Sequence, residues 1–130
     1  MIKLILVAAG GAIGAILRHL TNKLSIRFFG SSDVYTGTVF ANIIGCFLAG
    51  FALAYFSHTE IASENLRYFL TIGILGSLTT FSTFASEAFQ LIQKPGKKLF
   101  LYLLYQVVVT LAMLIAGFGI TAWILGGYNG

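Results

Sequence analysis

The chain has 130 residues, of which 58% are hydrophobic and only 9% are charged, and its mean hydropathy is +0.91. Soluble domains carry about 25% charged residues, so this composition excludes a soluble protein and predicts a single transmembrane domain over residues 1–130. The net charge of +4 does not indicate a nucleic-acid partner, because the cations lie singly or in small groups beside apolar runs, as membrane anchors do.

The first predicted span covers about residues 2–20 and contains closely spaced glycines. Gly10 and Gly14 lie one helical turn apart and favour close packing against another helix. Residues 9–14 also nearly match a dinucleotide-binding fingerprint, but that motif needs a soluble strand–turn–helix unit. A cleaved signal peptide is a second competing interpretation. Near the end of this span, Arg18 must reach the interface or occupy a polar pocket.

A polar connection is expected over Thr21 to Asp33, followed by a second span at about residues 34–56 that carries no charge. Small residues recur at every fourth position of this span: Gly37, Ala41, Gly45 and Ala49. Such a ridge lets another helix approach closely. Asn42 lies beside the ridge. It is either a hydrogen-bonding clip between helices or a donor that offers its NH2 group to an anion or substrate.

The third predicted span, at about residues 68–92, is unusually rich in hydroxyl groups. Five of them fall within seven positions: Ser77, Thr79, Thr80, Ser82 and Thr83. Hydrocarbon cannot satisfy these groups, so they must face protein, a cavity or an ion. Gly73 and Gly76 weaken the helix just upstream, where backbone carbonyls could serve as ligands. The alternative is a closely packed helix whose hydroxyls bond to carbonyls one turn earlier.

Phe81, Phe84 and Glu87 follow these hydroxyls at spacings of three residues. The edge of a phenylalanine ring is electropositive, so a ring turned edge-on favours a small anion without a fixed countercharge. With amide and hydroxyl donors nearby, an anion could exchange its water for several weak contacts, as conduction requires. The competing interpretation is that both rings face lipid or core.

The fourth predicted span, at about residues 99–125, carries a polar stripe made by Tyr102, Gln106 and Thr110. Four spans with short loops place both termini on one side, and so thin a bundle favours a homo-oligomer. Lys3 and Arg67 then lie on the side of the termini. Six cations lie on the other side: Arg18, Lys23, Arg27, Lys94, Lys97 and Lys98. The positive-inside rule therefore predicts that the termini are outside.

Three stretches of this chain, in this order, resemble the Fluc (CrcB-type) family of fluoride channels: Gly10 to Arg18, Gly37 to Gly45 and Gly76 to Phe84. The resemblance extends over the whole chain in length, span count and motif order. It implies an all-α membrane protein with four transmembrane helices, the third broken near Gly76–Thr80. It also implies an antiparallel, dual-topology homodimer in a bacterial inner membrane. Two pores would passively and selectively carry fluoride out of the cytoplasm.

The same resemblance implies a set of site residues. Those of the fluoride pore are Asn42, Phe81, Ser82, Thr83, Phe84, Glu87, Tyr105 and Thr110, with Arg18 in the vestibule. A structural sodium ion is implied at the dimer centre, held by the backbone carbonyls of Gly76 and Thr79. Fluoride, a second copy of the chain and the lipid bilayer are the expected partners. No organic cofactor and no catalytic residue is expected.

A small multidrug-resistance-type, proton-coupled exporter is the alternative function, because it would have a similar size and number of spans. Such an exporter would be expected to carry a carboxylate in its first span, and this first span has none. An intramembrane enzyme would need paired polar groups at depth, and Glu87 has no evident partner of that kind. The two-against-six distribution of cations is unbalanced for a chain that inserts equally in both orientations.

Overall fold

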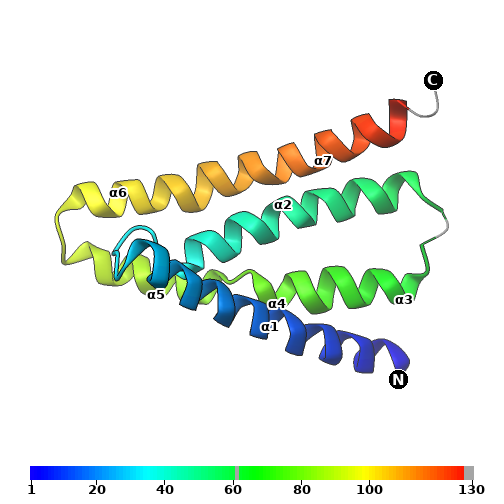
Figure 1. The fold of residues 1–130 in the computed structure, drawn as a ribbon, viewed down its shortest axis with the longest axis horizontal. Helices are drawn as coiled ribbons and strands as arrows, with labels where there is room; N and C mark the ends of the chain where they lie inside the picture. Colours follow the sequence, from blue (N-terminus) through cyan, green and yellow to red (C-terminus); the bar gives the residue numbers. More distant parts are fainter. Residues whose placement is uncertain (61, 128–130) are drawn as a thin grey trace.

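Four helical rods make up the protein in the computed structural model, which describes residues 1–60 and 62–127 (Figure 1). The first two are α1 (Ile2–Phe29) and α2 (Gly37–His58). The third combines α3 (Glu64–Arg67), η1 (Tyr68–Leu75), α4 (Gly76–Leu78) and α5 (Phe81–Ile92). The fourth combines α6 (Gly96–Leu104), η2 (Tyr105–Val109) and α7 (Thr110–Gly127). All elements of the described residues are helical, so the predicted all-α class with four spans is confirmed.

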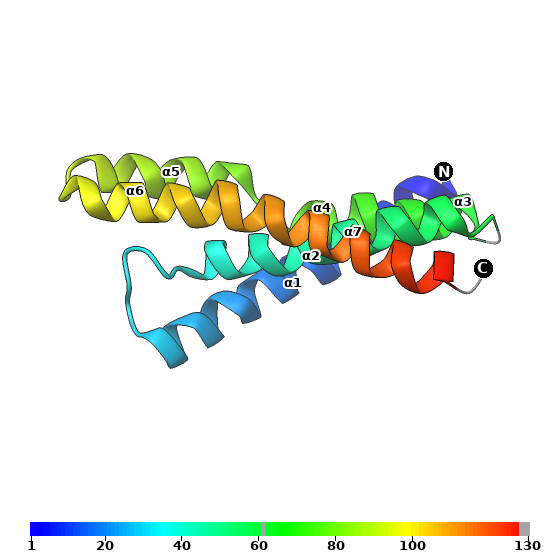
Figure 2. The ribbon, with the colours of Figure 1, turned by 90° about the horizontal axis from the view of Figure 1, so that it is seen from above.

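Each rod is long and apolar enough to cross a bilayer. Large hydrophobic side chains face outward along all of them, as Trp123 does at 80% exposure. The chain is therefore a multi-pass membrane protein. The start of α1 and the end of α7 lie at one end of the bundle, and the loop 30–36 and the turn 93–95 lie at the other (Figure 1). Toward that second end α1 diverges from α5 and α6 (Figure 2).

Helix α1 is longer than the predicted first span. It continues past Leu20 and ends at Phe29, where Gly30 adopts a φ of 69°. The connection expected over Thr21 to Asp33 is thus corrected to a loop of residues 30–36. Polar residues do not end a helix when their side chains can turn outward or bond backward. The Thr21 hydroxyl does the latter, donating to the Leu17 carbonyl at 2.8 Å.

The third rod is interrupted near its middle. Thr79 (φ −79°, ψ 152°) and Thr80 (φ −150°, ψ 125°) are extended, so α4 stops at Leu78 and α5 restarts at Phe81. The Thr80 hydroxyl caps α5 by accepting a hydrogen bond from the Thr83 N–H at 3.3 Å. The break lies inside the window predicted from the sequence. It exposes backbone groups that an unbroken helix would have paired internally.

Glycines allow the rods to pack backbone against backbone. A Cβ added to Gly50 in α2 would collide with the Leu114 carbonyl oxygen, and one on Gly117 in α7 would collide with that of Phe47. Gly10 and Gly14 in α1 face η1 in the same way. Gly45, from the ridge expected on α2, faces Thr79 and Leu78, whereas Gly50 lies outside that ridge and faces α7. These contacts fix the spacing of the rods that carry the polar groups described below.

We predict that Gly117→Ala lowers the free energy of unfolding by about 1–3 kcal/mol, the usual effect of overpacking a tight contact. The measurement is thermal unfolding of the purified protein in detergent. Gly119→Ala is the matched control, because a Cβ there would meet no heavy atom of the described chain within 4 Å. Equal melting temperatures for the two variants would contradict the close approach of α2 and α7.

An ion-pair cluster fastens the loop 30–36 to the start of the fourth rod. The Asp33 carboxylate accepts hydrogen bonds from Lys94 and from Lys98, the latter at 2.7 Å. The hydrogen bond from Lys94 has the larger effect and that from Lys98 the smaller, and together they lower the pKa of Asp33 from its ordinary 3.8 to about 2. Both partners are partly exposed, so the cluster orients the loop more than it stabilises the fold.

The contribution of this cluster to the free energy of unfolding should vanish in acid. A carboxyl with a lowered pKa stabilises the folded state fully above its ordinary pKa and loses that effect as the pH falls from about 4 through about 2. Asp33 is the only aspartate of the chain, so carboxyl-labelled aspartate gives one NMR titration. We expect a midpoint near 2 that Lys94→Ala raises toward the ordinary value. Lys97→Ala, outside the cluster, should leave it in place.

Candidate functional site

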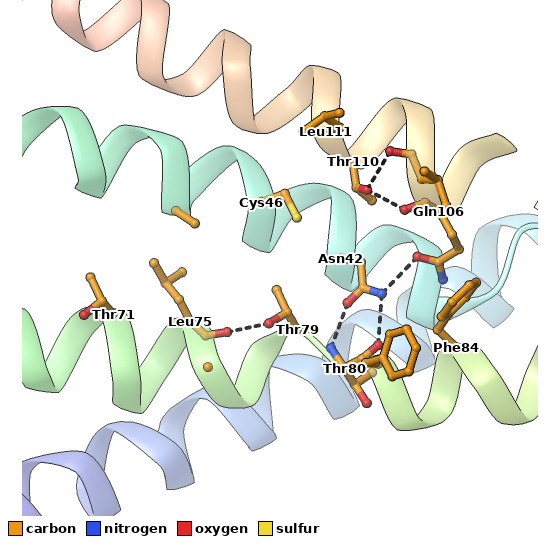
Figure 3. Close-up of a pocket in the computed structure, with 14 residues that line it drawn as sticks. Asn42, Cys46, Thr71, Leu75, Thr79, Thr80, Phe84, Gln106, Thr110 and Leu111 are labelled. Atoms are coloured by element: carbon orange, nitrogen blue, oxygen red, sulfur yellow. Dashed lines mark hydrogen bonds between the residues drawn. The ribbon is translucent and has the colours of Figure 1, made fainter. Parts of the chain in front are cut away.

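Asn42 pairs the backbone groups that the helix break sets free (Figure 3). Its Oδ1 accepts from the Thr80 N–H at 2.8 Å, and its Nδ2 donates to the Thr80 carbonyl at 3.1 Å. Both residues are buried, with Asn42 only 9% exposed. An amide is the side chain best suited to this position, because it carries a donor and an acceptor on one planar group. Asn42 thus acts as a clip between α2 and the break.

A chain of hydrogen bonds leads from Asn42 across the fourth rod. The second hydrogen of Asn42 Nδ2 goes to Gln106 Oε1 at 2.9 Å. Gln106 Nε2 donates to the Tyr102 hydroxyl at 3.2 Å, and that hydroxyl donates to the Glu87 carboxylate at 2.6 Å. Tyr102 is fully buried and Gln106 nearly so. A continuous polar line therefore crosses an otherwise apolar interior, from the helix break to a carboxylate.

Glu87 ends this line at the N-terminus of α2. Its two carboxylate oxygens also accept from the Thr36 and Thr38 hydroxyls, each at 2.8 Å. Thr36 is the N-cap of α2. A negative charge at this place interacts favourably with the positive end of the helix dipole. The carboxylate is thus held by three hydroxyl donors from two other rods, and its position is well defined.

Phe81 and Phe84 border a cavity of about 640 Å³ that is open on the outer face of the bundle. Their ring centroids are 5.4 Å apart and the rings are tilted by 58°. Phe84 is also stacked on Tyr102, at 5.9 Å and 16°. The cavity is lined among others by Asn42, Thr79, Phe81, Phe84, Gln106 and Thr110. The expected aromatic pair and the polar line therefore meet in one cavity.

A second cavity, of about 340 Å³, lies between α1, α2 and α5. Arg18, Thr83 and Glu87 are among the residues that line it. Thr83 and Ser82 each have their hydroxyl 3.2 Å from the Thr80 hydroxyl. These hydroxyls run along α5 between the break and Glu87. Arg18, the expected vestibule arginine, thus lines the same cavity as Thr83, and the Ser82 hydroxyl lies beside that of Thr80.

The structure separates one predicted residue from this region and adds two others. The Tyr105 hydroxyl lies 3.4 Å from that of Tyr35, at the side of the polar line. Tyr102 and Gln106 instead occupy the line itself. Both belong to the polar stripe with Thr110 that the spacing of the fourth span indicates, so the pattern contained the information. Thr110 lines the larger cavity and donates its hydroxyl to the Gln106 carbonyl.

The carbonyls of Gly76 and Thr79 have lost the donors that a continuous helix would give them. The Thr80 N–H, four residues after Gly76, donates to Asn42. The Thr83 N–H, four residues after Thr79, donates to the Thr80 hydroxyl. Both residues line the larger cavity. Unwound carbonyls of this kind suit a sodium ion. Among the described residues, His, Cys, Asp and Glu form no cluster of three that could hold a metal.

The fold and the site define a class: a four-helix membrane protein with a line of hydrogen-bonding groups through its apolar interior. The family model described as "CrcB-like protein, Camphor Resistance (CrcB)" matches residues 5–118. The chain belongs to this family. The resemblance seen in the sequence is thereby confirmed.

Three relatives illustrate the similarity, and each is called fluoride-specific ion channel FluC. The protein of Shewanella frigidimarina is 42% identical over 120 residues, which cover 90% of this chain and 94% of the relative. That of Agrobacterium fabrum is 39% identical over 118 residues, with the same coverage. That of Shewanella baltica is 46% identical over 96 residues, covering 72% of this chain and 74% of the relative.

Proposed function

We propose that this chain forms a passive, fluoride-selective ion channel that exports fluoride from the cytoplasm. The observation that carries the proposal is the polar line of Asn42, Gln106, Tyr102 and Glu87 beside the Phe81–Phe84 pair. The names of the relatives support the choice of ion. The chain is a channel protein of the CrcB family and not an enzyme.

A path of this kind replaces the water of a small anion by several weak contacts. Hydroxyls of α5 and the side-chain amides offer hydrogens, and the phenylalanine edges offer positive potential without a fixed charge. Binding is then strong enough to admit the ion and weak enough to release it. A negative-inside membrane potential drives an anion outward by about 2.3 kcal/mol per charge per 100 mV. Hydrogen fluoride that enters as a neutral acid and dissociates is thus removed without ATP.

We further propose that two copies associate as an antiparallel homodimer with two pores in the bacterial inner membrane. Phe81 is 78% exposed in the single chain, although it borders the cavity where the ion would pass. A second copy laid against this open face would close the cavity from outside. The excess of cations at the loop end favours termini that face outward. This excess does not favour the equal numbers of both orientations that an antiparallel dimer needs.

A sodium ion at the dimer centre, held by the Gly76 and Thr79 carbonyls, completes the proposal. The two unpaired carbonyls of one chain supply half of a four-oxygen shell, and a symmetric partner would supply the other half. Replacement of sodium by a larger cation should then lower both fluoride flux and the melting temperature of the dimer. Unchanged values of both in the larger cation would exclude a structural sodium ion.

Anion release from liposomes tests the channel function directly. Purified protein is reconstituted with potassium fluoride or potassium chloride inside, valinomycin clamps the charge, and ion electrodes follow the efflux. We expect rapid loss of fluoride with retention of chloride. Loss of both anions would leave a pore without the proposed selectivity. Retention of both anions would exclude the channel function and make the proton-coupled exporter the better candidate.

A further inference from the structure

Gln106 bridges the two halves of the polar line, and its orientation determines what Asn42 can offer. With Gln106 Oε1 toward Asn42, both hydrogens of Asn42 Nδ2 are used, one by Gln106 at 2.9 Å and one by the Thr80 carbonyl at 3.1 Å. In this arrangement Asn42 has no hydrogen left for an anion in the cavity. An anion that binds beside Asn42 must therefore displace one of these two acceptors.

The Gln106 oxygen is the acceptor that can leave at little cost. If the Thr80 carbonyl left, the Asn42 clip would lose one of its two hydrogen bonds to the helix break. Inversion of the Gln106 amide only exchanges two atoms of nearly equal size. The inverted amide directs Nε2 toward Asn42 Nδ2. Two donors that face each other repel unless an acceptor lies between them. A small anion at this point accepts from both amides, so the inverted orientation is stable only when the anion is present.

The other end of Gln106 can follow the inversion because its partner is a hydroxyl. The Tyr102 hydroxyl now accepts from Nε2 at 3.2 Å and donates to Glu87 at 2.6 Å. After inversion it faces Oε1 and donates to that oxygen instead, since a hydroxyl serves as donor or acceptor. Glu87 then keeps the hydroxyls of Thr36 and Thr38. Every buried group of the line is hydrogen-bonded in both arrangements.

We propose that Gln106 is an anion-contacting residue whose amide inverts when fluoride binds beside Asn42, and that this inversion transfers the Tyr102 hydroxyl from Glu87 to Gln106. The proposal rests on the proposed channel function. It couples the ion near the helix break to the carboxylate at the start of α2. Fluoride at one point of the path thus changes the number of donors that hold Glu87 from three to two.

Side-chain NMR of the wild-type protein tests the inversion. With glutamine labelled in its amide nitrogen, we expect fluoride to shift the Gln106 resonance and an equal concentration of chloride to leave it unchanged. Gln90 and Gln93, exposed in and after α5, serve as internal controls, and Gln106→Met assigns the third signal. The carboxyl carbon of Glu87 should move with the same fluoride dependence, and Tyr102→Phe should abolish that movement.

Liposome flux provides the second measurement. Gln106→Met keeps the length of the side chain and removes its N–H groups, so fluoride release should fall by more than about tenfold. Gln93→Met should conduct like the wild type. A Gln106 resonance that fluoride does not move, or wild-type flux in Gln106→Met, would exclude the inversion while the channel function stands. If wild-type liposomes release no fluoride, the channel function itself fails.

Discussion

Liposomes that carry Phe81→Ile or Phe84→Ile should release fluoride more than about tenfold more slowly than wild-type liposomes. A tenfold decrease in rate corresponds to about 1.4 kcal/mol added to the activation barrier. Isoleucine keeps the apolar character of the site but has no electropositive edge. The two rings are tilted by 58° at a centroid distance of 5.4 Å, and Phe84 is held by its stack on Tyr102. The change therefore removes the ring edges at a place where the neighbouring groups are fixed.

The fold should survive these substitutions. Phe81 is 78% exposed in the single chain, so it contributes little to the core of one copy. Phe89→Ile is the matched control: Phe89 lies in the same helix α5 and is 67% exposed, but it lies away from the larger cavity. We expect wild-type flux in this control, and the same elution volume as the wild type for all three variants in gel filtration. Wild-type flux in both Phe81→Ile and Phe84→Ile would remove the assigned role.

The number and order of the helices could be predicted because they depend on hydropathy alone. Each span is an apolar run long enough to cross the bilayer as a helix, and a helix pairs its own backbone groups within the run. The break in the third rod was also predictable in outline. Gly73 and Gly76 weaken the helix, the family resemblance implies a break near Gly76–Thr80, and the structure places the extended residues at Thr79 and Thr80.

The end of α1 could not be predicted in the same way. Hydropathy reports where the bilayer ends, whereas a helix ends where its backbone geometry changes. The residues after Leu20 are too polar to continue the apolar run, but they remain helical as far as Phe29. The helix ends at Gly30, which has a φ of 69°. Glycine is the residue that adopts such an angle without strain. A helix-ending glycine was therefore a better marker than the loss of hydrophobicity.

The partners within the polar line were the hardest part to predict. Spacing shows which residues share a face of one helix, but not which neighbouring helix that face meets. The spacing places Tyr102, and not Tyr105, on the polar stripe with Gln106 and Thr110, but it does not show that this stripe meets Glu87. In the structure the π-helical segment η2 (Tyr105–Val109) lies between Tyr102 and Thr110, and its wider turns change the rotational phase between these two residues. Tyr102 meets Glu87 and Tyr105 meets Tyr35.

Asn42 illustrates how two competing interpretations of one residue can coexist. The sequence left open whether it is a clip between helices or a donor to an anion. Its bonds to Thr80 make it a clip. Its remaining hydrogen points to Gln106, the group from which an anion would take it. The clip uses Oδ1 and one hydrogen of Nδ2, whereas the proposed ion contact needs the other hydrogen of Nδ2. Substitution can therefore separate the clip from the proposed ion contact.

Asn42→Ala should both destabilise the protein and abolish fluoride release. It leaves the buried N–H and carbonyl of Thr80 unpaired, and each such group costs about 1–3 kcal/mol. Thermal unfolding in detergent measures the loss, and hydrogen exchange locates it, because the Thr80 amide should exchange much faster than in the wild type. Asn65→Ala, on the exposed face of α3, is the control and should change neither property. A Thr80 amide still protected in Asn42→Ala would contradict the clip.

Asn42→Asp separates the two roles. The aspartate keeps an oxygen that accepts from the Thr80 N–H, but it has no hydrogen for the Thr80 carbonyl, for Gln106 or for an anion. When ionised it also repels fluoride at close range. We therefore expect a Thr80 amide that remains protected, together with fluoride release lowered at least as far as in Asn42→Ala. Protection without conduction would assign the clip to Oδ1 and the ion contact to Nδ2. Substantial fluoride release by this variant would instead show that the ion passes without help from the Asn42 amide hydrogens.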